Sequence, residues 1–167
     1  MSETAKVVMI DDENDLCAVV KENLEATGKF AVETLSDPLQ AEEFIRVQKP
    51  NIILLDVVMP QRQGPSIIQA LKKDPELKRI PIIVLSGKGE MVFNKKKDEF
   101  KWVPNSKIVQ TRGDLPDIKG AEALAEFYGV ADYLSKPFTT DILVQIIEDV
   151  LAQYYKAPGS GEESIDV

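Results

Sequence analysis

Short apolar runs that each end in a polar residue constrain this chain more than any other feature. Three of them are VVMI (7–10), IILL (52–55) and IIVL (82–85), and a fourth surrounds Leu134. Continuous apolar runs of this length are typical of strands that are buried on both faces of a parallel sheet. FAVETL (30–35) is weaker and alternates more, which indicates an edge strand.

The segments between these runs have the spacing of amphipathic helices. Apolar side chains recur three and four positions apart at Leu16, Val19, Val20 and Leu24, at Leu39, Ala41, Phe44 and Ile45, at Ile67, Ile68 and Leu71, and from Ile142 to Leu151. Thr139 or Thr140 is a plausible cap for the last helix. Strands that alternate with helices predict an α/β fold, and we expect a doubly wound parallel sheet of five strands covered by five helices.

Composition limits the class of protein. The 167 residues are enough for one ordinary domain with a sizeable core. A net charge of −8 argues against direct nucleic-acid binding, since phosphates would be repelled. No apolar stretch has the length of a membrane span, and the single Cys17 fits a reducing cytoplasm. The absence of histidine excludes histidine-based catalysis, histidine metal ligands and a phosphohistidine on this chain.

The residues that end the apolar runs suggest a binding site. Ligands of open parallel sheets bind at the carboxyl ends of the strands, and the residues that fall there are Asp11, Asp12, Asp56, Ser86 and Lys136. Converging carboxylates need a cation, and oxygen ligands with room for water suit Mg²⁺. A lysine and a hydroxyl at the same edge suit a phosphoryl group. Singly, each is an ordinary helix start or turn residue; their joint placement indicates Mg²⁺-assisted phosphoryl chemistry.

At these positions the chain resembles the receiver domains of two-component response regulators. The shared features are DDE (11–13), LLDVVMP with Asp56, Gly64 in the following loop, Ser86-Gly87, and DYLSKPF (132–138). The resemblance covers about residues 1–86 and 120–155. It implies a flavodoxin-like fold with strand order 2-1-3-4-5.

The resemblance also implies a role for each matching residue. Asp56 is expected to be the phosphoacceptor, a carboxylate nucleophile. Asp12, Asp56 and the backbone carbonyl of Val58 are expected to bind Mg²⁺ directly, and Asp11 is expected to orient a metal-bound water. Lys136 is expected to pair with the carboxylate at rest and with the phosphoryl group afterwards.

Four further residues complete the expected switch. Ser86, followed by Gly87, supplies the hydroxyl that bonds the phosphoryl group, and Tyr133 is the coupled aromatic residue. Tyr133 is open to a simpler interpretation, as a partly exposed tyrosine at a strand end. The family implies a cis peptide bond before Pro137.

One segment departs from the family. Ser86 and Lys136 are 50 positions apart, about double the usual separation, and we place an insertion at about 88–119 between the fourth strand and the fourth helix, which is then 121–129. Residues 87–119 carry a net charge of +3, whereas the rest carries −11. FKWV (100–103) and KIVQT (107–111) suggest a weak hairpin. We expect order around 100–111 and a position that responds to Asp56, although a tolerated surface insertion remains the alternative.

Together these features predict a receiver domain over 1–156 and a flexible tail or linker remnant over 157–167. The chain is expected to be a cytoplasmic signalling domain that promotes only its own phosphorylation and dephosphorylation. Its donor must be a histidine kinase or a histidine phosphotransfer protein, and its downstream partner is an unknown protein, or a second copy in a homodimer.

The alternative is a pseudo-receiver that binds partners without phosphorylation, although such a domain would usually have lost one of the five site residues. A haloacid-dehalogenase-type hydrolase would need a DxD motif after the first strand, which DDEND lacks. A flavodoxin would need an uncharged phosphate loop at the same place.

Overall fold

The computed structural model describes residues 4–56, 59–62, 64–86, 89–94, 99–104 and 129–155; for 86, 89–94, 99–104 and 135 it describes the backbone only. Five parallel strands form one sheet in the order β2-β1-β3-β4-β7. Their bounds are Ala5–Ile10 (β1), Phe30–Leu35 (β2), Ile52–Asp56 (β3), Ile82–Ser86 (β4) and Asp132–Ser135 (β7). The predicted strand order 2-1-3-4-5 is therefore confirmed, because β7 is the fifth strand of this sheet.

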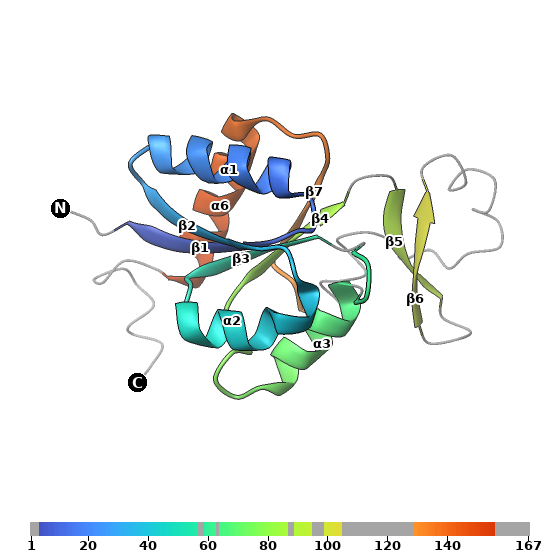
Figure 1. Cartoon of the computed structure of the whole chain (residues 1–167). Coiled ribbons are helices and arrows are strands. Elements are labelled where there is room, and N and C mark those ends of the chain that lie inside the picture. The colour runs from blue at the N-terminus through green and yellow to red at the C-terminus, as the bar shows by residue number, and fades with distance from the viewer. Residues whose placement is uncertain are drawn as a thin grey trace.

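Helices cover both faces of the sheet. Figure 1 shows α1 (Asn14–Ala26) and α6 (Thr140–Tyr154) on one face, and α2 (Ala41–Gln48) and α3 (Gly64–Lys73) on the other. A short 3₁₀ helix, η1 (Pro38–Gln40), leads into α2. The described residues contain no other α-helix. The helix expected at 121–129 lies outside the described residues, except for Gly129.

The core consists of two apolar layers, one on each side of the sheet. Val8, Ile10, Ile53 and Leu55 pack toward α2 and α3. Their sequence neighbours, among them Met9 and Leu54, pack toward α1 and α6. Successive strand residues point to opposite faces, so a strand with helices on both sides must be apolar throughout. This requirement explains the uninterrupted runs VVMI, IILL and IIVL.

The outer elements have one exposed face, as expected. In β2, Phe30 and Val32 are buried whereas Ala31 and Glu33 are exposed, which confirms the edge strand. In α1 the buried side chains are Cys17, Val20 and Leu24. Val19 is 52% exposed, and Leu39 before α2 is 59% exposed, so these two members of the predicted helical stripes lie outside the core.

The insertion contains a hairpin whose strand pairing was not predicted from the sequence. FKWV lies in a strand, β6 (Glu99–Pro104), but its antiparallel partner is β5 (Gly89–Asn94). The partner predicted from sequence, 107–111, lies outside the described residues, and so does the expected tail 157–167. Four residues (95–98) separate β5 from β6 in the sequence.

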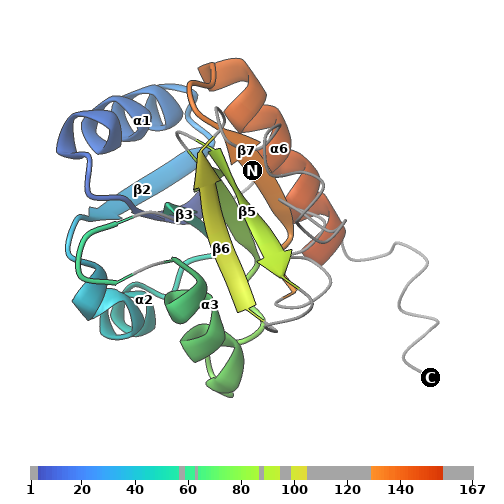
Figure 2. The same ribbon diagram turned by 90° about the vertical axis from the view of Figure 1, so that its right-hand side faces the viewer.

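The hairpin lies beyond the carboxyl ends of the sheet strands. Figure 1 shows it past the end of the sheet at which β1 finishes, and Figure 2 shows it in front of the sheet when the molecule is viewed from that end. It begins three residues after β4 ends at Ser86. The insertion is thus connected directly to the edge where the candidate site residues lie. Among the described helices, none combines the length and the apolar composition that a membrane crossing requires.

The start of α6 supplies a test of the helix boundary. Thr139 is the N-cap, and its hydroxyl accepts a hydrogen bond from the backbone N–H of Ile142 at 3.2 Å. Thr139→Ala should lower the free energy of unfolding by about 1 kcal/mol, because one N–H of the first turn loses its partner. Thr139→Ser keeps the hydroxyl and should cost much less. Urea denaturation of both variants checks this, and equal losses would contradict the capping role.

Candidate functional site

Three aspartates converge at the carboxyl ends of β1 and β3. Asp11 and Asp12 follow β1, and Asp56 is the last residue of β3. The strand register pairs Ile10 with Leu55, which places the two strand ends side by side. Each aspartate offers a carboxylate oxygen, and these atoms all lie within 4.8 Å of one another. The predicted convergence of these carboxylates is therefore present in the structure.

Burial distinguishes this cluster from a patch of surface acids. Asp11 is completely buried and Asp56 is 4% exposed, and they are the only buried charged residues among those the structure describes. Asp12 is half-buried. Carboxylates removed from water are costly unless they are paired. Their placement therefore indicates a site that is built to hold positive charge.

Asp11 is fixed by three separate contacts. Its Oδ1 accepts a hydrogen bond from the backbone N–H of Glu13 at 2.9 Å, and its own N–H donates to the carbonyl of Leu35 at 3.1 Å. Its carbonyl accepts a bond from Cys17 Sγ at 3.4 Å. The start of α1 and the end of β2 thus hold Asp11 in place. Burial also raises the pKa of the Cys17 thiol to about 12, so Cys17 is a protonated structural residue and no nucleophile.

Lys136 supplies the positive charge of the site. It follows β7 directly, and its Nζ lies 2.7 Å from Asp11 Oδ2 and 2.7 Å from Glu13 Oε1. The distance from Nζ to Asp56 Oδ1 is longer, at 3.7 Å. In this structure the ammonium is therefore closer to Asp11 and Glu13 than to the predicted phosphoacceptor. The contact with Glu13 was not predicted from the sequence, since only its place in the DDE motif singled it out.

The pKa values of Lys136 and Asp11 reflect both their burial and the attraction between their charges. Burial alone would lower the pKa of Lys136, but its bonds to Asp11 and Glu13 and the nearby charge of Asp56 outweigh burial and raise that pKa to about 12. Burial raises the pKa of Asp11, and the Lys136 ammonium opposes that rise. Lys136 thus stays charged at neutral pH. One ammonium faces several carboxylates, so the site carries an excess of negative charge.

The donor set fits a magnesium ion. Three carboxylates on two adjacent strands provide hard oxygen ligands, and the half-buried Asp12 leaves one side open to water. A dication would offset the excess negative charge that Lys136 leaves unbalanced. The fit rests on the described side chains alone, since the expected carbonyl ligand of Val58 lies outside the described residues.

The remaining predicted residues are placed in part. Ser86 ends β4 and pairs with Ser135 of β7, so its backbone lies one strand away from Asp56, while its side chain and Gly87 lie outside the description. Tyr133 in β7 is half-buried and packs against the layer of the core under α2 and α3. The Lys136–Pro137 peptide bond is cis. The switch roles of these residues stay predictions.

The comparison with known protein families agrees with the geometry of the site. The family model of the response regulator receiver domain matches residues 7–99, which is more than half of the chain. The chain belongs to the response regulator receiver domain family. The matched range contains the three aspartates but ends before Lys136 of this receiver domain.

Curated relatives agree with this assignment. Response regulator Rre1 of Synechocystis is 26% identical over 164 residues, covering 98% of this chain and 59% of that protein. The phosphate regulon transcriptional regulatory protein PhoB of Rhizobium meliloti is 34% identical over 146 residues, covering 87% of this chain and 52% of that protein. This receiver domain therefore spans just over half the length of the curated relatives that it matches.

Solved structures share the fold. A putative response regulator from Chloroflexus aurantiacus superposes with a TM-score of 0.63 at 20% identity, covering 90% of this chain and 99% of its own. The chemotaxis response regulator CheY4 of Vibrio cholerae gives a TM-score of 0.63 at 22% identity, covering 89% and 100%. At these identities the likeness establishes the flavodoxin-like architecture of the receiver domain alone.

The charge balance of the site predicts how the receiver domain responds to losing Lys136. Lys136→Met should lower the free energy of unfolding without added metal by about 3 kcal/mol, because Asp11 and Asp56 are left buried without their counter-charge. Added Mg²⁺ should recover much of this loss. Thermal or urea denaturation with and without Mg²⁺ measures both effects.

Lys29→Met is the matched control. Lys29 is 57% exposed and pairs with Glu148 on the surface, where water screens the interaction, so its loss should matter much less. If Lys136→Met were no more destabilising than Lys29→Met, the claim that Lys136 offsets the negative charge of the buried aspartates would be wrong.

Proposed function

We propose that this receiver domain accepts a phosphoryl group on Asp56 and passes the resulting change of state to a partner protein. The observation that carries the proposal is the convergence of three aspartate carboxylates, with the Lys136 ammonium beside Asp11 and Asp56. A lone carboxylate would repel a phosphoryl donor. A carboxylate beside an ammonium and a dication site can receive one.

The chemistry assigns a role to each described residue. An oxygen of Asp56 attacks the phosphorus atom, a new O–P bond forms, the bond from phosphorus to the donor nitrogen breaks, and the donor imidazole leaves with the electron pair. Asp11, Asp12 and Asp56 would hold Mg²⁺, which supplies neutralisation of the phosphoryl charge. Lys136, 3.7 Å from Asp56, is close enough to turn toward a phosphoryl group bound there.

The donor must come from outside the chain. The sequence contains no histidine, so the phosphoryl group cannot originate here from a phosphohistidine. We therefore propose a histidine kinase or a histidine phosphotransfer protein as the donor. The domain would promote only its own phosphorylation and dephosphorylation, in the cytoplasm. The net charge of −8 disfavours direct contact with nucleic acid.

Phosphorylation itself is directly testable. Incubation with acetyl phosphate and Mg²⁺ should add one phosphoryl group, detected by intact-mass measurement, and chelation of the metal should prevent it. Asp56→Asn should abolish uptake, because the amide is no nucleophile. Asp15→Asn, an exposed acidic residue in the first turn of α1, should behave as the parent does. Equal labelling of parent and Asp56→Asn would refute the assignment of Asp56, whereas a parent that takes up no phosphoryl group would favour the pseudo-receiver.

The metal ligands can be tested separately from phosphorylation. Asp12→Ala should abolish Mg²⁺ binding in calorimetry, because a carboxylate ligand is lost. Lys136→Ala should keep metal binding, since it removes a competing cation, but should uncouple phosphorylation from any change in conformation. Unchanged Mg²⁺ affinity in Asp12→Ala would show that the ion binds elsewhere.

A further inference from the structure

The described part of the loop between Asp56 and α3, residues 59–62, contains a residue in an unfavourable backbone conformation. Gln61 has a backbone φ of 72°, in the left-handed region that residues other than glycine rarely adopt. The next residue, Arg62, donates its N–H to the carbonyl of Pro60 at 2.8 Å, which closes a tight turn. On the near side, Met59 is anchored in the core at 2% exposure. A contact with another element is therefore needed at the other end of the loop, at Arg62, to maintain this conformation.

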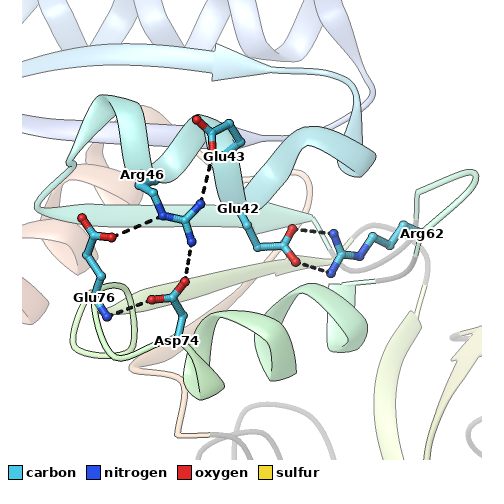
Figure 3. A network of polar contacts seen from close by, with 6 residues as sticks. All are labelled: Glu42, Glu43, Arg46, Arg62, Asp74 and Glu76. Atoms are coloured by element: carbon cyan, nitrogen blue, oxygen red, sulfur yellow. Dashed lines mark hydrogen bonds and ion pairs between the residues drawn. The ribbon is translucent and has the colours of Figure 1, made fainter.

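A bidentate ion pair between Arg62 and Glu42 provides this contact. Arg62 Nη1 lies 2.6 Å from Glu42 Oε1, and Arg62 Nη2 lies 2.8 Å from Glu42 Oε2. Figure 3 shows the two parallel bonds from the loop to α2. The side chains are 18% and 30% exposed, so the pair is largely shielded from water. Paired bonds of this geometry fix orientation as well as distance.

The same guanidinium contacts the other elements beside the loop. Arg62 Nε donates to Ser66 Oγ in the first turn of α3 at 3.2 Å, and Nη1 approaches the carbonyl of Pro38 in η1 at 3.5 Å. The hydrogen bond from Arg62 is the main cause that lowers the pKa of Glu42, which therefore remains charged at neutral pH. Arg62 thus connects the loop to α2, η1 and α3 at once.

We infer that Glu42 and Arg62 are a positioning pair for the phosphoacceptor loop. They hold the described part of this loop, residues 59–62, which follows Asp56 and the expected carbonyl ligand of Val58 in the sequence. Releasing the pair would leave Asp11, Asp12 and Asp56 in place but would loosen the loop that completes the metal site. The inference rests on the proposed function, and it adds two residues outside the acidic cluster to the machinery of that site.

A second arginine provides a matched control. Arg46 lies one turn further along α2 and pairs with Glu43, Asp74 and Glu76, as Figure 3 shows. These contacts join α2 to the connection between α3 and β4 and do not reach the loop after Asp56. Loss of Arg46 therefore removes an ion-pair network of the same helix without releasing the loop.

The experiment compares four variants of the full chain with the parent. Arg62→Gln and Glu42→Gln each break the pair, the double variant Glu42→Arg with Arg62→Glu reverses it, and Arg46→Gln is the control. Calorimetry gives the Mg²⁺ concentration at half-saturation. Hydrogen exchange of the amides in 57–63 reports the loop directly, and the phosphorylation rate at saturating Mg²⁺ separates metal binding from the transfer step.

Arg62→Gln and Glu42→Gln should each weaken Mg²⁺ binding by about tenfold, as expected when a group that orients metal ligands is lost. Exchange in 57–63 should quicken, while the phosphorylation rate at saturating Mg²⁺ changes little. The reversed pair should restore most of the affinity, which a purely local packing effect would not do. Arg46→Gln should leave both the affinity and the loop exchange near those of the parent.

The inference is overturned if Arg62→Gln matches Arg46→Gln in Mg²⁺ affinity and in loop exchange. Failure of the proposed function has a different signature: the parent itself would bind no Mg²⁺ and take up no phosphoryl group. In that case quicker exchange in Arg62→Gln would still show that the ion pair restrains the loop. A parent that binds no Mg²⁺ would overturn the claim that the pair supports a metal site.

Discussion

The burial of both faces of the central strands determines the rest of this structure. β1, β3 and β4 have helices on either side, and their apolar residues are essentially inaccessible to water. A polar side chain on such a strand is tolerated only at its end. The parallel arrangement brings these ends to one edge, so Asp11 and Asp56 meet there as a consequence of how the core is packed.

The same constraint determines what the site must contain. Two carboxylates at a buried edge require positive charge, and Lys136 approaches them from the far end of the sequence. Its single charge is shared between Asp11 and Glu13 and leaves an excess of negative charge near Asp56. Such a site would accept a dication, and in the proposed function Lys136 would then turn from Glu13 toward the phosphoryl group.

The sequence predicted the strand order, the edge strand and the site aspartates because these follow from the period of apolar residues and from a specific motif. Contacts that depend on the path of a loop were not predictable. Glu13 reaches Lys136 across 123 positions, and Arg62 reaches Glu42 across 20, without any local pattern that pairs them. The pairing of FKWV with 89–94 was likewise not predicted, because periodicity alone does not show which apolar segment pairs with a given strand.

The helices show the same limit. Helical spacing identified α1 correctly, yet Val19 is exposed because the stripe that faces the sheet is centred on Cys17, Val20 and Leu24. Val19 and Val20 are adjacent, and only one of two neighbours on a helix points directly at the sheet. The spacing thus indicates a helix more reliably than it identifies each buried residue.

A crystal structure with Mg²⁺ and beryllofluoride, a phosphoryl mimic, tests the central claim most directly. The account predicts beryllofluoride on the carboxylate of Asp56, Mg²⁺ held by the aspartate cluster, and Lys136 Nζ moved from Glu13 to the mimic. Beryllofluoride on another carboxylate, or Lys136 still paired with Glu13 beside an occupied Asp56, would contradict it.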